Sequence, residues 1–576
     1  MTTIAENVAS VNDSVLLMSR RLQRLGLDIE EVRWLNPAVH VWRVELRDRS
    51  CPWFCSQGQG ITREVALKDA LRVFFERLSC HFFFMPYFLG QDIATQTFVY
   101  YPDERWFPVK GDGLPEGLLD EPTLLHYTVN DELKAGMLLD AHTGYRDGAI
   151  CAIPFIRQLT GDEVWMPINI IRNLYVGNGM AAGDTVYEAR VEALAEIFQR
   201  HIKNTIISSG ISLPDIPSSV QQRYPAIVET LDALRAHGFT VLVKDASLGG
   251  RFPLINVTLI NSADGGCRAA FGAHPKFETA FQRAVLALLS VDSLDDLSGC
   301  SWPSFDLSAV ADQQNLDAHL IDASGTVGWD LFATETDYDF TEWNIDGDAN
   351  AEFDQLCHLI HEVDMDIYIA DYHHLGVNCC RIIVPGMSEV RPVDVMMRDN
   401  RNVGDGLRQL MLKLPTLDDQ QVERLLLVLE EAGFDDSQRI VDIIGIVPDN
   451  GSVWQSLRVA ELKCLLNLHL GELSEALIWS DGLQRLDLPA ERARLYRCLH
   501  QCLMFRLDQE RPLAQYHQLL NQIYGADCVN RVLEMIDGHG VFACLSSSTF
   551  ALEEFTAHGR MLALYARLQA AKAIPD

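Results

Sequence analysis

The chain has 576 residues, of which 80 are acidic and 47 are lysine or arginine, so its formal net charge is −33. This length predicts two or more domains, and the 48% hydrophobic and 22% charged content is that of a globular protein. The negative charge disfavours direct nucleic-acid binding because it repels phosphates. It suits a basic protein partner, with simple solubility as the plainer alternative.

Signals for a cellular compartment are few. The N-terminal segment lacks the charged start and apolar run of a signal peptide, and no stretch of about 18 apolar residues predicts a membrane span. The 14 cysteines form no paired CxxC spacing of a zinc or thioredoxin-like site. We therefore expect reduced thiols in a cytoplasmic protein that does not bind a membrane.

The first elements follow one another as a helix, two strands and a second helix. Leucines at helical spacing predict a helix over residues 10–27, and alternation of apolar and polar residues predicts a strand over 39–48. A second strand is expected near 51–58, where glycines turn the chain into a helix at 66–77.

Strand-like segments also precede two further helices. Three modules of this kind predict an α+β fold with mixed sheets and helices packed together. The glycine-containing break at 177–184 could cradle a phosphate, although a plain turn is the commoner outcome. The strand-like segments cover 164–176, 239–247, 253–262 and 267–274, and the helices cover 189–200 and 280–291.

The three helices share one residue pattern when they are aligned without gaps. Carboxylates three residues apart on converging helices would form a pocket for hard cations, but only two of six such positions are acidic. Three ordinary amphipathic helices are the alternative. The alanine columns are Ala66, Ala189, Ala280 and Ala70, Ala193, Ala284, and the columns with acids are Val73, Glu196, Ala287 and Glu76, Gln199, Ser290.

Longer segments together resemble a known family. They are GQG followed by ITREVALKDALRVFFERLS, then NLYVGNGMAAGDTVYEARVEALAEIFQR, DASLGGRFPLINV, FGAHPKFETAFQR and HHLGVNCCRIIVPGM. In this order and spacing they resemble the YcaO family, and specifically the branch that is accessory to methylthiolation of a ribosomal small-subunit protein. The resemblance implies a YcaO-like core domain over residues 1–402.

The resemblance also implies a chemistry and its residues. Members of the family use ATP to phosphorylate a backbone amide oxygen, and Mg-ATP binds among the three repeated helices. A basic ribosomal protein and a radical-SAM methylthiotransferase are the implied partners. By position, the implied metal ligands are Glu76 and Glu196, and the implied nucleotide-binding residues are Ser14, Asp184, Glu188, Arg200 and Arg283.

Several positions depart from the family pattern. Three expected acidic ligands are replaced, at Val73, Gln199 and Ala287. Asn7 and Leu17 stand where phosphate-facing basic residues are expected, and Asp184 replaces an expected asparagine. Because a magnesium ion sheds water only for several anionic ligands, these replacements predict weak or absent Mg-ATP binding.

Other acids could supply the metal contacts in a shifted register. Asp69, Glu192 and Glu278 are the candidates. Asp69 and Glu192 each lie one helical turn, roughly 6 Å, from an expected position, which is a large displacement for a metal site.

A second histidine and cysteine cluster, at His373, His374, Cys379 and Cys380, also suggests a metal. The run that follows it is strand-like, so we expect the two cysteines to be buried on alternate sides of a sheet, without a metal.

Helical spacing replaces strand signals after residue 403. Helices are expected over 420–434, 456–486 and 491–507, the middle one resembling a tetratricopeptide hairpin. We expect an all-α tetratricopeptide-like domain over 403–576 that binds a partner or forms a homodimer, with support of the core as the alternative. The terminal AKAIPD lacks the alternating-proline tail of azoline-forming members of the family, which disfavours heterocycle synthesis.

Two functions remain open from the sequence. The first is an accessory factor for methylthiolation with a degenerate Mg-ATP site; any surviving activity would be the amide phosphorylation of a cyclodehydratase-like enzyme. The second is a non-catalytic scaffold that binds a peptide or protein and has lost ATP binding.

Overall fold

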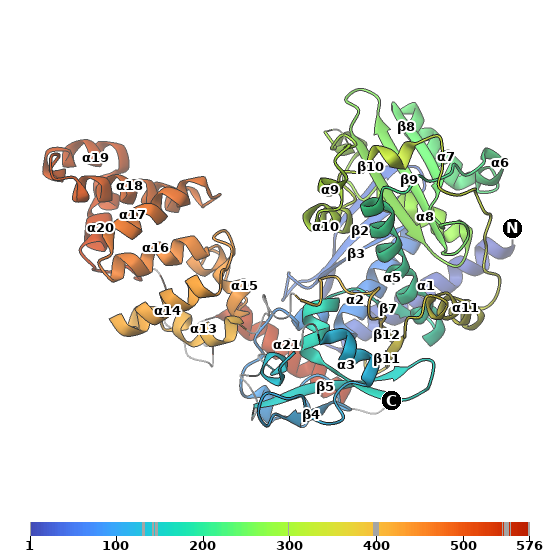
Figure 1. The fold of residues 1–576 in the computed structure, drawn as a ribbon, viewed down its shortest axis with the longest axis horizontal. Helices are drawn as coiled ribbons and strands as arrows, with labels where there is room; N and C mark the ends of the chain where they lie inside the picture. The colour runs from blue at the N-terminus through green and yellow to red at the C-terminus, as the bar shows by residue number, and fades with distance from the viewer. Residues whose placement is uncertain are drawn as a thin grey trace.

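The computed structural model describes residues 2–128, 133–140, 143, 148–297, 299–394, 403–543, 545, 552 and 555–573, with side chains described from Val11 onward except at residues 94, 403 and 405. Figure 1 shows an α/β core with an arm of helices beside it, and the final helix α21 lies back against the core. Within these ranges, no helix combines the length and hydrophobicity needed to cross a membrane.

The first module is an antiparallel sheet with strand order β1-β2-β3, followed by helix α2. Thr62 caps α2 by accepting a hydrogen bond from the backbone N–H of Val65 at 3.3 Å. Helix α1 starts before the expected residue 10, and β1 has no counterpart among the predicted strands. The elements are α1 (Thr2–Arg24), β1 (Ile29–Ala38), β2 (Val41–Asp48), β3 (Cys55–Gly60) and α2 (Arg63–Ser79).

The second module is a six-stranded sheet with strand order β4-β5-β11-β12-β7 and β6 beside β5. Helix α5 packs against β7 and β12. Thr185 caps its start, and Gly210 ends it in the left-handed region with φ +63°. The elements are β4 (Arg105–Pro108), β5 (Ala149–Arg157), β6 (Glu163–Pro167), β7 (Met180–Gly183), α5 (Val186–Ser209), β11 (Tyr368–Tyr372) and β12 (Asn378–Ile383).

The third module is an antiparallel sheet with strand order β10-β9-β8, on which helix α8 packs. Its elements are β8 (Phe239–Asp245), β9 (Leu254–Asn261), β10 (Cys267–Ala273) and α8 (Phe277–Leu288). Other helices of the core are η1 (Phe82–Phe84), η2 (Ile93–Thr95), α3 (Glu121–Tyr127), η3 (Ala135–Leu138), α4 (Ile168–Ile170), η5 (Ile171–Tyr175), α6 (Ser218–Gln221), α7 (Pro225–Ala236), η6 (Leu294–Leu297), α9 (Leu307–Val310), α10 (Gln313–Ile321), η7 (Trp329–Phe332) and α11 (Ala349–His361).

Each module brings a strand glycine onto the backbone of its helix. A Cβ on Gly58 would lie 2.1 Å from the nitrogen of Ala70, and a Cβ on Gly272 would lie 2.1 Å from the oxygen of Ala280. Gly183 approaches the nitrogen of Ala189 in the same way, at 2.5 Å. These contacts explain the alanine columns, whose six members are all buried. The predicted small-residue face is therefore confirmed as the face that packs on the sheets.

Two predictions about the core were wrong. All pairings between the strands that the structure describes are antiparallel, whereas mixed sheets were expected. Short hairpins join many of these strands, and a parallel pair would need a long crossover.

The second wrong prediction is the strand-like segment over residues 164–176. Only β6 is a strand there; the chain then turns into α4 and the π-helical η5, and β7 forms inside the predicted break. A short apolar run fits a buried helix as well as a strand. Asn173 donates from Nδ2 to the backbone oxygen of Asn169 at 2.9 Å, a four-residue spacing that belongs to a helix.

The helical arm has its own hydrophobic core. Gly471 turns the chain between α16 and α17 with φ +76°, so the predicted helices form a hairpin there. Its tetratricopeptide character stays a prediction. The helices are α13 (Val403–Leu412), η8 (Leu414–Thr416), α14 (Asp419–Glu431), α15 (Ile440–Ile444), η9 (Val453–Gln455), α16 (Val459–His469), α17 (Leu473–Gly482), η10 (Leu483–Arg485), α18 (Ala490–Leu507), η11 (Leu513–Gln515), α19 (His517–Tyr524) and α20 (Ala526–Ile536).

The final helix α21 (Thr556–Lys572) leaves the arm and joins the core. Tyr565 donates from its hydroxyl to the backbone oxygen of Val99, and Lys572 donates from Nζ to that of Tyr100 at 2.9 Å. The chain after residue 403 therefore contributes both a separate helical arm and a helix that packs on the core.

The adjacent cysteines lie on β12 as the sequence predicts. Cys379 packs in the hydrophobic cluster that contains α2, and Cys380 packs in the one that contains α5. Burial raises the pKa of both thiols well above the ordinary value. Both side chains therefore belong to the packed core on opposite faces of the sheet.

Candidate functional site between the three repeated helices

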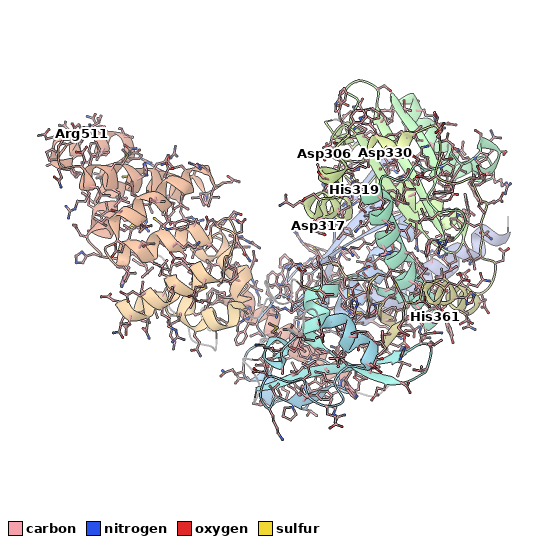
Figure 2. All side chains as sticks on the ribbon, in the orientation of Figure 1. Asp306, Asp317, His319, Asp330, His361 and Arg511 are labelled. Atoms are coloured by element: carbon pink, nitrogen blue, oxygen red, sulfur yellow. The ribbon has the colours of Figure 1, made fainter. Side chains whose placement is uncertain are left out.

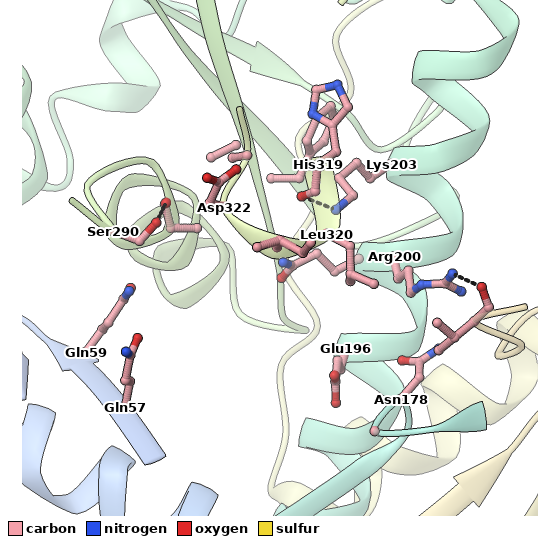
Figure 3. Close-up of a pocket in the computed structure, with 18 of the residues that line it drawn as sticks. Gln57, Gln59, Asn178, Glu196, Arg200, Lys203, Ser290, His319, Leu320 and Asp322 are labelled. Carbon is pink, nitrogen blue, oxygen red and sulfur yellow. Dashed lines mark hydrogen bonds between the residues drawn. The ribbon is translucent and has the colours of Figure 1, made fainter. Parts of the chain in front are cut away.

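A cavity lies between α2, α5 and α8, with strand β3 along one side. Its two adjoining parts have volumes of about 530 and 740 Å³. Figure 3 shows Glu196 on α5 and, on another wall, Gln57 and Gln59 of β3. The residues that line both parts are Gln57, Gln59, Glu76, Arg77, Met180, Glu196, Gln199 and Ala287.

The six positions of the two columns with acids all line this cavity. Val73 lines the larger part, Ser290 lines the smaller part, and the other four line both. Ser290 lies beyond the end of α8 and donates from Oγ to the backbone oxygen of Ala287 at 2.9 Å. The alignment of the three helices therefore identified the walls of one cavity from sequence positions more than 200 residues apart.

Two carboxylates of these columns, Glu76 and Glu196, face the cavity without a hydrogen bond or ion pair to the part of the chain that the structure describes. Burial raises the pKa of Glu76 well above its usual range, and the nearby Glu196 raises it further. Burial also raises the pKa of Glu196 to about 7, although the side chain reaches the water inside the cavity. Near neutral pH this pair therefore carries less than its full negative charge.

Next to this pair, two cations of α2 bind the acids at the start of α5. Lys68 Nζ lies 2.6 Å from Asp184 Oδ2, and Arg72 Nη2 lies 3.4 Å from both Asp184 and Glu188. The backbone N–H of Asp184 donates to Glu188 at 3.0 Å. Burial alone would raise the pKa of Asp184, but the hydrogen bond from Lys68 and the charge of Arg72 lower it below the ordinary value. Both acids are thus neutralised by the chain itself.

A third cation, Arg283 of α8, pairs with Glu192 of α5 and also donates from Nη1 to the backbone oxygen of Ala273 at 3.0 Å. Burial would raise the pKa of Glu192, but Arg283 lowers it below its usual range. Burial lowers the pKa of His274 to about 3, so its 4.0 Å approach to Glu192 is not an ion pair at neutral pH. Arg283 is the counter-ion of Glu192.

The other acids proposed for a shifted metal site are also engaged or distant. Asp69 accepts a hydrogen bond from the backbone N–H of Gln59 at 2.9 Å, and burial raises its pKa. Glu278 is exposed, does not line the cavity and accepts from Gln282 Nε2 at 3.3 Å. Across the described residues, no three histidine, cysteine, aspartate or glutamate side chains are grouped to hold a metal ion.

The remaining implied nucleotide-binding residues lie at the edges of this site. Arg200 lines the smaller part of the cavity, but its guanidinium donates to the backbone oxygens of Glu389 and Val390, the latter at 2.9 Å. Ser14 donates from Oγ to Asp184 at 3.3 Å. Leu17 is 51% exposed, and the side chain of Asn7 lies outside the described part of the chain.

Lys68 and Arg72 are the functional residues that the sequence analysis missed. They lie four residues apart on α2 and line the larger part of the cavity together with Val73 and Glu76. A projection of α2 onto one helix face would have flagged them as charges beside the acidic columns. Their partners, however, lie 116 residues away and become visible only in the fold.

Comparison with known proteins shows the family to which the chain belongs. The family described as "YcaO cyclodehydratase, ATP-ad Mg2+-binding" matches residues 57–388, and the one described as "YcaO cyclodehydratase C-terminal domain" matches residues 404–574. The chain is 42% identical over 578 residues to the "Ribosomal protein S12 methylthiotransferase accessory factor YcaO" of Escherichia coli, covering 99% of both. It is equally identical to an "Uncharacterized protein" of Haemophilus influenzae, covering 99% of this chain and 98% of that protein.

Solved structures give weaker similarities. A "Heterocyclase in complex with substrate and Cofactor" is 15% identical, with a TM-score of 0.41 over 66% of this chain and 55% of that one. The YcaO of Methanopyrus kandleri "bound with AMPPCP and Mg2+" is 16% identical, with a TM-score of 0.39 over 66% of this chain and 91% of that one. On the family matches and the 42% identity over nearly the whole length, this chain belongs to the YcaO family.

Proposed function

We propose that this chain is a cytoplasmic accessory factor for the methylthiolation of ribosomal protein S12 and that it works by binding its partners, with little or no use of Mg-ATP. The E. coli relative carries the accessory-factor name. The net charge of −33 suits a basic ribosomal protein. The second partner in this proposal is the radical-SAM methylthiotransferase itself.

One observation supports the loss of Mg-ATP chemistry more than any other. Three acids beside the cavity, Asp184, Glu188 and Glu192, are paired with Lys68, Arg72 and Arg283 of the same chain. A magnesium ion needs several oxygen ligands to offset the loss of its water. To use these three acids as ligands, an incoming cation would have to displace the lysine or arginine that already neutralises each of them.

The donor set therefore does not fit a Mg-nucleotide group. Three family acids are replaced at Val73, Gln199 and Ala287, so Glu76 and Glu196 are the two carboxylates of the acidic columns that face the cavity. Each charge-assisted hydrogen bond contributes about 1.5–3 kcal/mol. Losing several lowers nucleotide affinity by orders of magnitude.

A catalytic YcaO protein is the second candidate, and the open cavity favours it. Glu76 and Glu196 face a volume of about 740 Å³ and are free of protein partners within the described residues. If amide phosphorylation survives, these two carboxylates are its indispensable acids. A variant that removes both separates the two candidates.

The test is a complementation experiment read out by mass spectrometry of S12. Deleting the gene should lower the methylthiolated fraction of S12, and the wild-type chain should restore it. The double variant Glu76→Gln and Glu196→Gln should restore it equally, since the proposed role needs no metal. A double variant that keeps its melting temperature but fails to restore the modification would contradict the binding role and support catalysis. No loss of modification on deletion would contradict the accessory function.

A further inference from the structure

A small lobe, residues 301–332, lies at the mouth of the cavity. It contains α9, α10 and η7, and it is held together by backbone contacts such as Ser304 N–H to the oxygen of Val327 at 2.9 Å. Lys203 of α5 donates from Nζ to the backbone oxygen of His319 at 2.9 Å, and Arg268 of β10 donates to that of Asp322. Figure 3 shows Lys203 and His319 beside the cavity. Lys203 and Arg268 therefore hold the backbone of the lobe against the core.

The lobe presents large apolar side chains to water. Phe305 is 87% exposed, Ile321 is 81% exposed and Trp302 is 65% exposed. Phe305 stacks on the partly exposed Trp329 with ring centroids 5.8 Å apart, and Ile321 lines the smaller part of the cavity. Aromatic and aliphatic side chains left this exposed and gathered in 32 residues are typical of a surface that a partner covers.

The same lobe carries an excess of unpaired acids. Residues 301–332 contain five aspartates and no glutamate, lysine or arginine. Figure 2 shows Asp306, Asp317 and Asp330 on one side of the core, the side that faces the helical arm in Figure 1. Within the described residues, none of these three forms an ion pair with a lysine or arginine. This surface therefore has negative charge that the chain does not balance.

We propose that the 301–332 lobe is the docking surface for an extended, lysine- and arginine-rich segment that carries a large apolar side chain. The basic groups pair with Asp306, Asp317 and Asp330, and the apolar side chain packs on the Phe305–Trp329 pair. An arginine can also stack on these rings. The segment continues past Ile321 into the cavity that holds Glu76 and Glu196.

Charge decides against other occupants. Nucleic acid and anionic lipid carry the same sign of charge as the lobe and are repelled. A second copy of this chain, with a net charge of −33, is disfavoured on the same ground. A basic polypeptide is the class of partner that satisfies both the acids and the exposed rings.

This inference rests on the proposed function, because it names how the basic substrate of that function is held. The probe is purified, fluorescently labelled ribosomal protein S12, titrated with the full-length chain at low and at raised salt while anisotropy is followed. The apolar variant is Phe305→Ser with Ile321→Ser. The charge variant is Asp306→Asn with Asp317→Asn and Asp330→Asn, in which asparagine keeps the helix-capping role of Asp306.

Matched control variants remove the same kinds of exposed side chain at positions outside the lobe. Leu125 on α3 is 78% exposed, so Leu125→Ser matches the apolar change at Ile321. Removal of three exposed acids at Asp103, Glu116 and Glu163 by Asn or Gln substitution matches the charge change. The melting temperature of every variant is compared with that of the wild type to show that folding is intact.

Three outcomes are distinguishable. The proposal expects both lobe variants to weaken S12 binding by about tenfold or more, the controls to leave it within about twofold, and the charge variant to show a smaller salt dependence. If the lobe variants bind S12 as tightly as the wild-type chain does, the proposed docking surface is wrong while the proposed function stands. If S12 does not bind the wild-type chain at all, both the surface and its partner are wrong.

Discussion

The cleft between the repeated helices and the 301–332 lobe are both rich in acids, but they treat their charges differently. In the cleft, Asp184 and Glu192 are neutralised by Lys68 and Arg283 from neighbouring helices. On the lobe, acids such as Asp317 have no ion pair within the described residues. Acids that the chain already pairs have little to offer an incoming cation, whereas acids without an ion pair attract one. We therefore propose that the lobe serves as a partner surface and that the cleft binds a metal ion weakly.

The largest predicted effect comes from removing a counter-ion inside the cleft. Arg283→Met should lower the free energy of unfolding of the core by about 2 kcal/mol, because Glu192 is left partly buried and unpaired. Both side chains keep about 30% exposure or less, so the loss is below that of a fully buried pair. Equilibrium urea unfolding measures it, with Arg223→Met, which breaks an ion pair about half exposed on each side, as the control. Equal losses in the two variants would show that the cleft pair is an ordinary surface contact.

A smaller effect is expected at the other end of the same network. Lys68→Met should cost about 1 kcal/mol at low salt, since Asp184 is 38% exposed and still retains Arg72 as a neighbour. The loss should shrink as salt is raised, because the pair is partly screened. A loss that does not depend on salt would mean that the lysine stem, rather than its charge, stabilises the helix contact.

The raised pKa of Glu196 gives a pH-dependent prediction. Its folded-state pKa is about 7, above the ordinary value of 4.5, so between these values the folded chain binds a proton that the unfolded chain has released. The stability contributed by Glu196 is complete below pH 4.5 and is lost as the pH rises through 7. Glu196→Gln does not titrate, so its melting temperature relative to wild type should rise by about 1–2 °C between pH 5 and pH 8. A constant difference across this range would contradict the raised pKa.

The smallest effect is predicted on the lobe. Asp317→Asn should change the free energy of unfolding by less than about 0.5 kcal/mol, because its carboxylate forms no ion pair within the described residues and accepts a hydrogen bond from Gln313 at 2.8 Å that asparagine can also accept. Urea unfolding under the conditions used for Arg283→Met gives a direct comparison. A loss as large as that in the cleft would mean that the lobe acids stabilise the fold and are not held for a partner.

Much of the core could be predicted from repeated local patterns. The alanine columns of α2, α5 and α8 mark the faces that pack on strand glycines, and the columns of Val73 and Glu76 face the shared cavity. These features depend on helix periodicity, which the sequence shows directly. Strand β1 was missed because its register shifts at Glu31–Arg33 and again after Leu35, and such bulges interrupt the alternation that predicts a strand.

The ion pairs of the cleft could not be predicted in the same way. Lys68 and Asp184 are 116 residues apart, and Arg283 and Glu192 are 91 residues apart. Helical spacing places each charge on a face of its own helix, but only the packing of three modules decides which charges meet. The sequence therefore predicted that family acids were replaced, and the fold adds that three basic residues neutralise acids that remain.

Calorimetric titration of the wild-type chain with AMPPCP and Mg²⁺ measures whether the cleft binds a Mg-nucleotide. The YcaO of M. kandleri, whose structure was solved with both, is the positive control. We expect no saturable heat for the wild-type chain at millimolar nucleotide. Binding with micromolar affinity that depends on Mg²⁺ would contradict it and would restore an ATP-dependent activity as the function of the cleft.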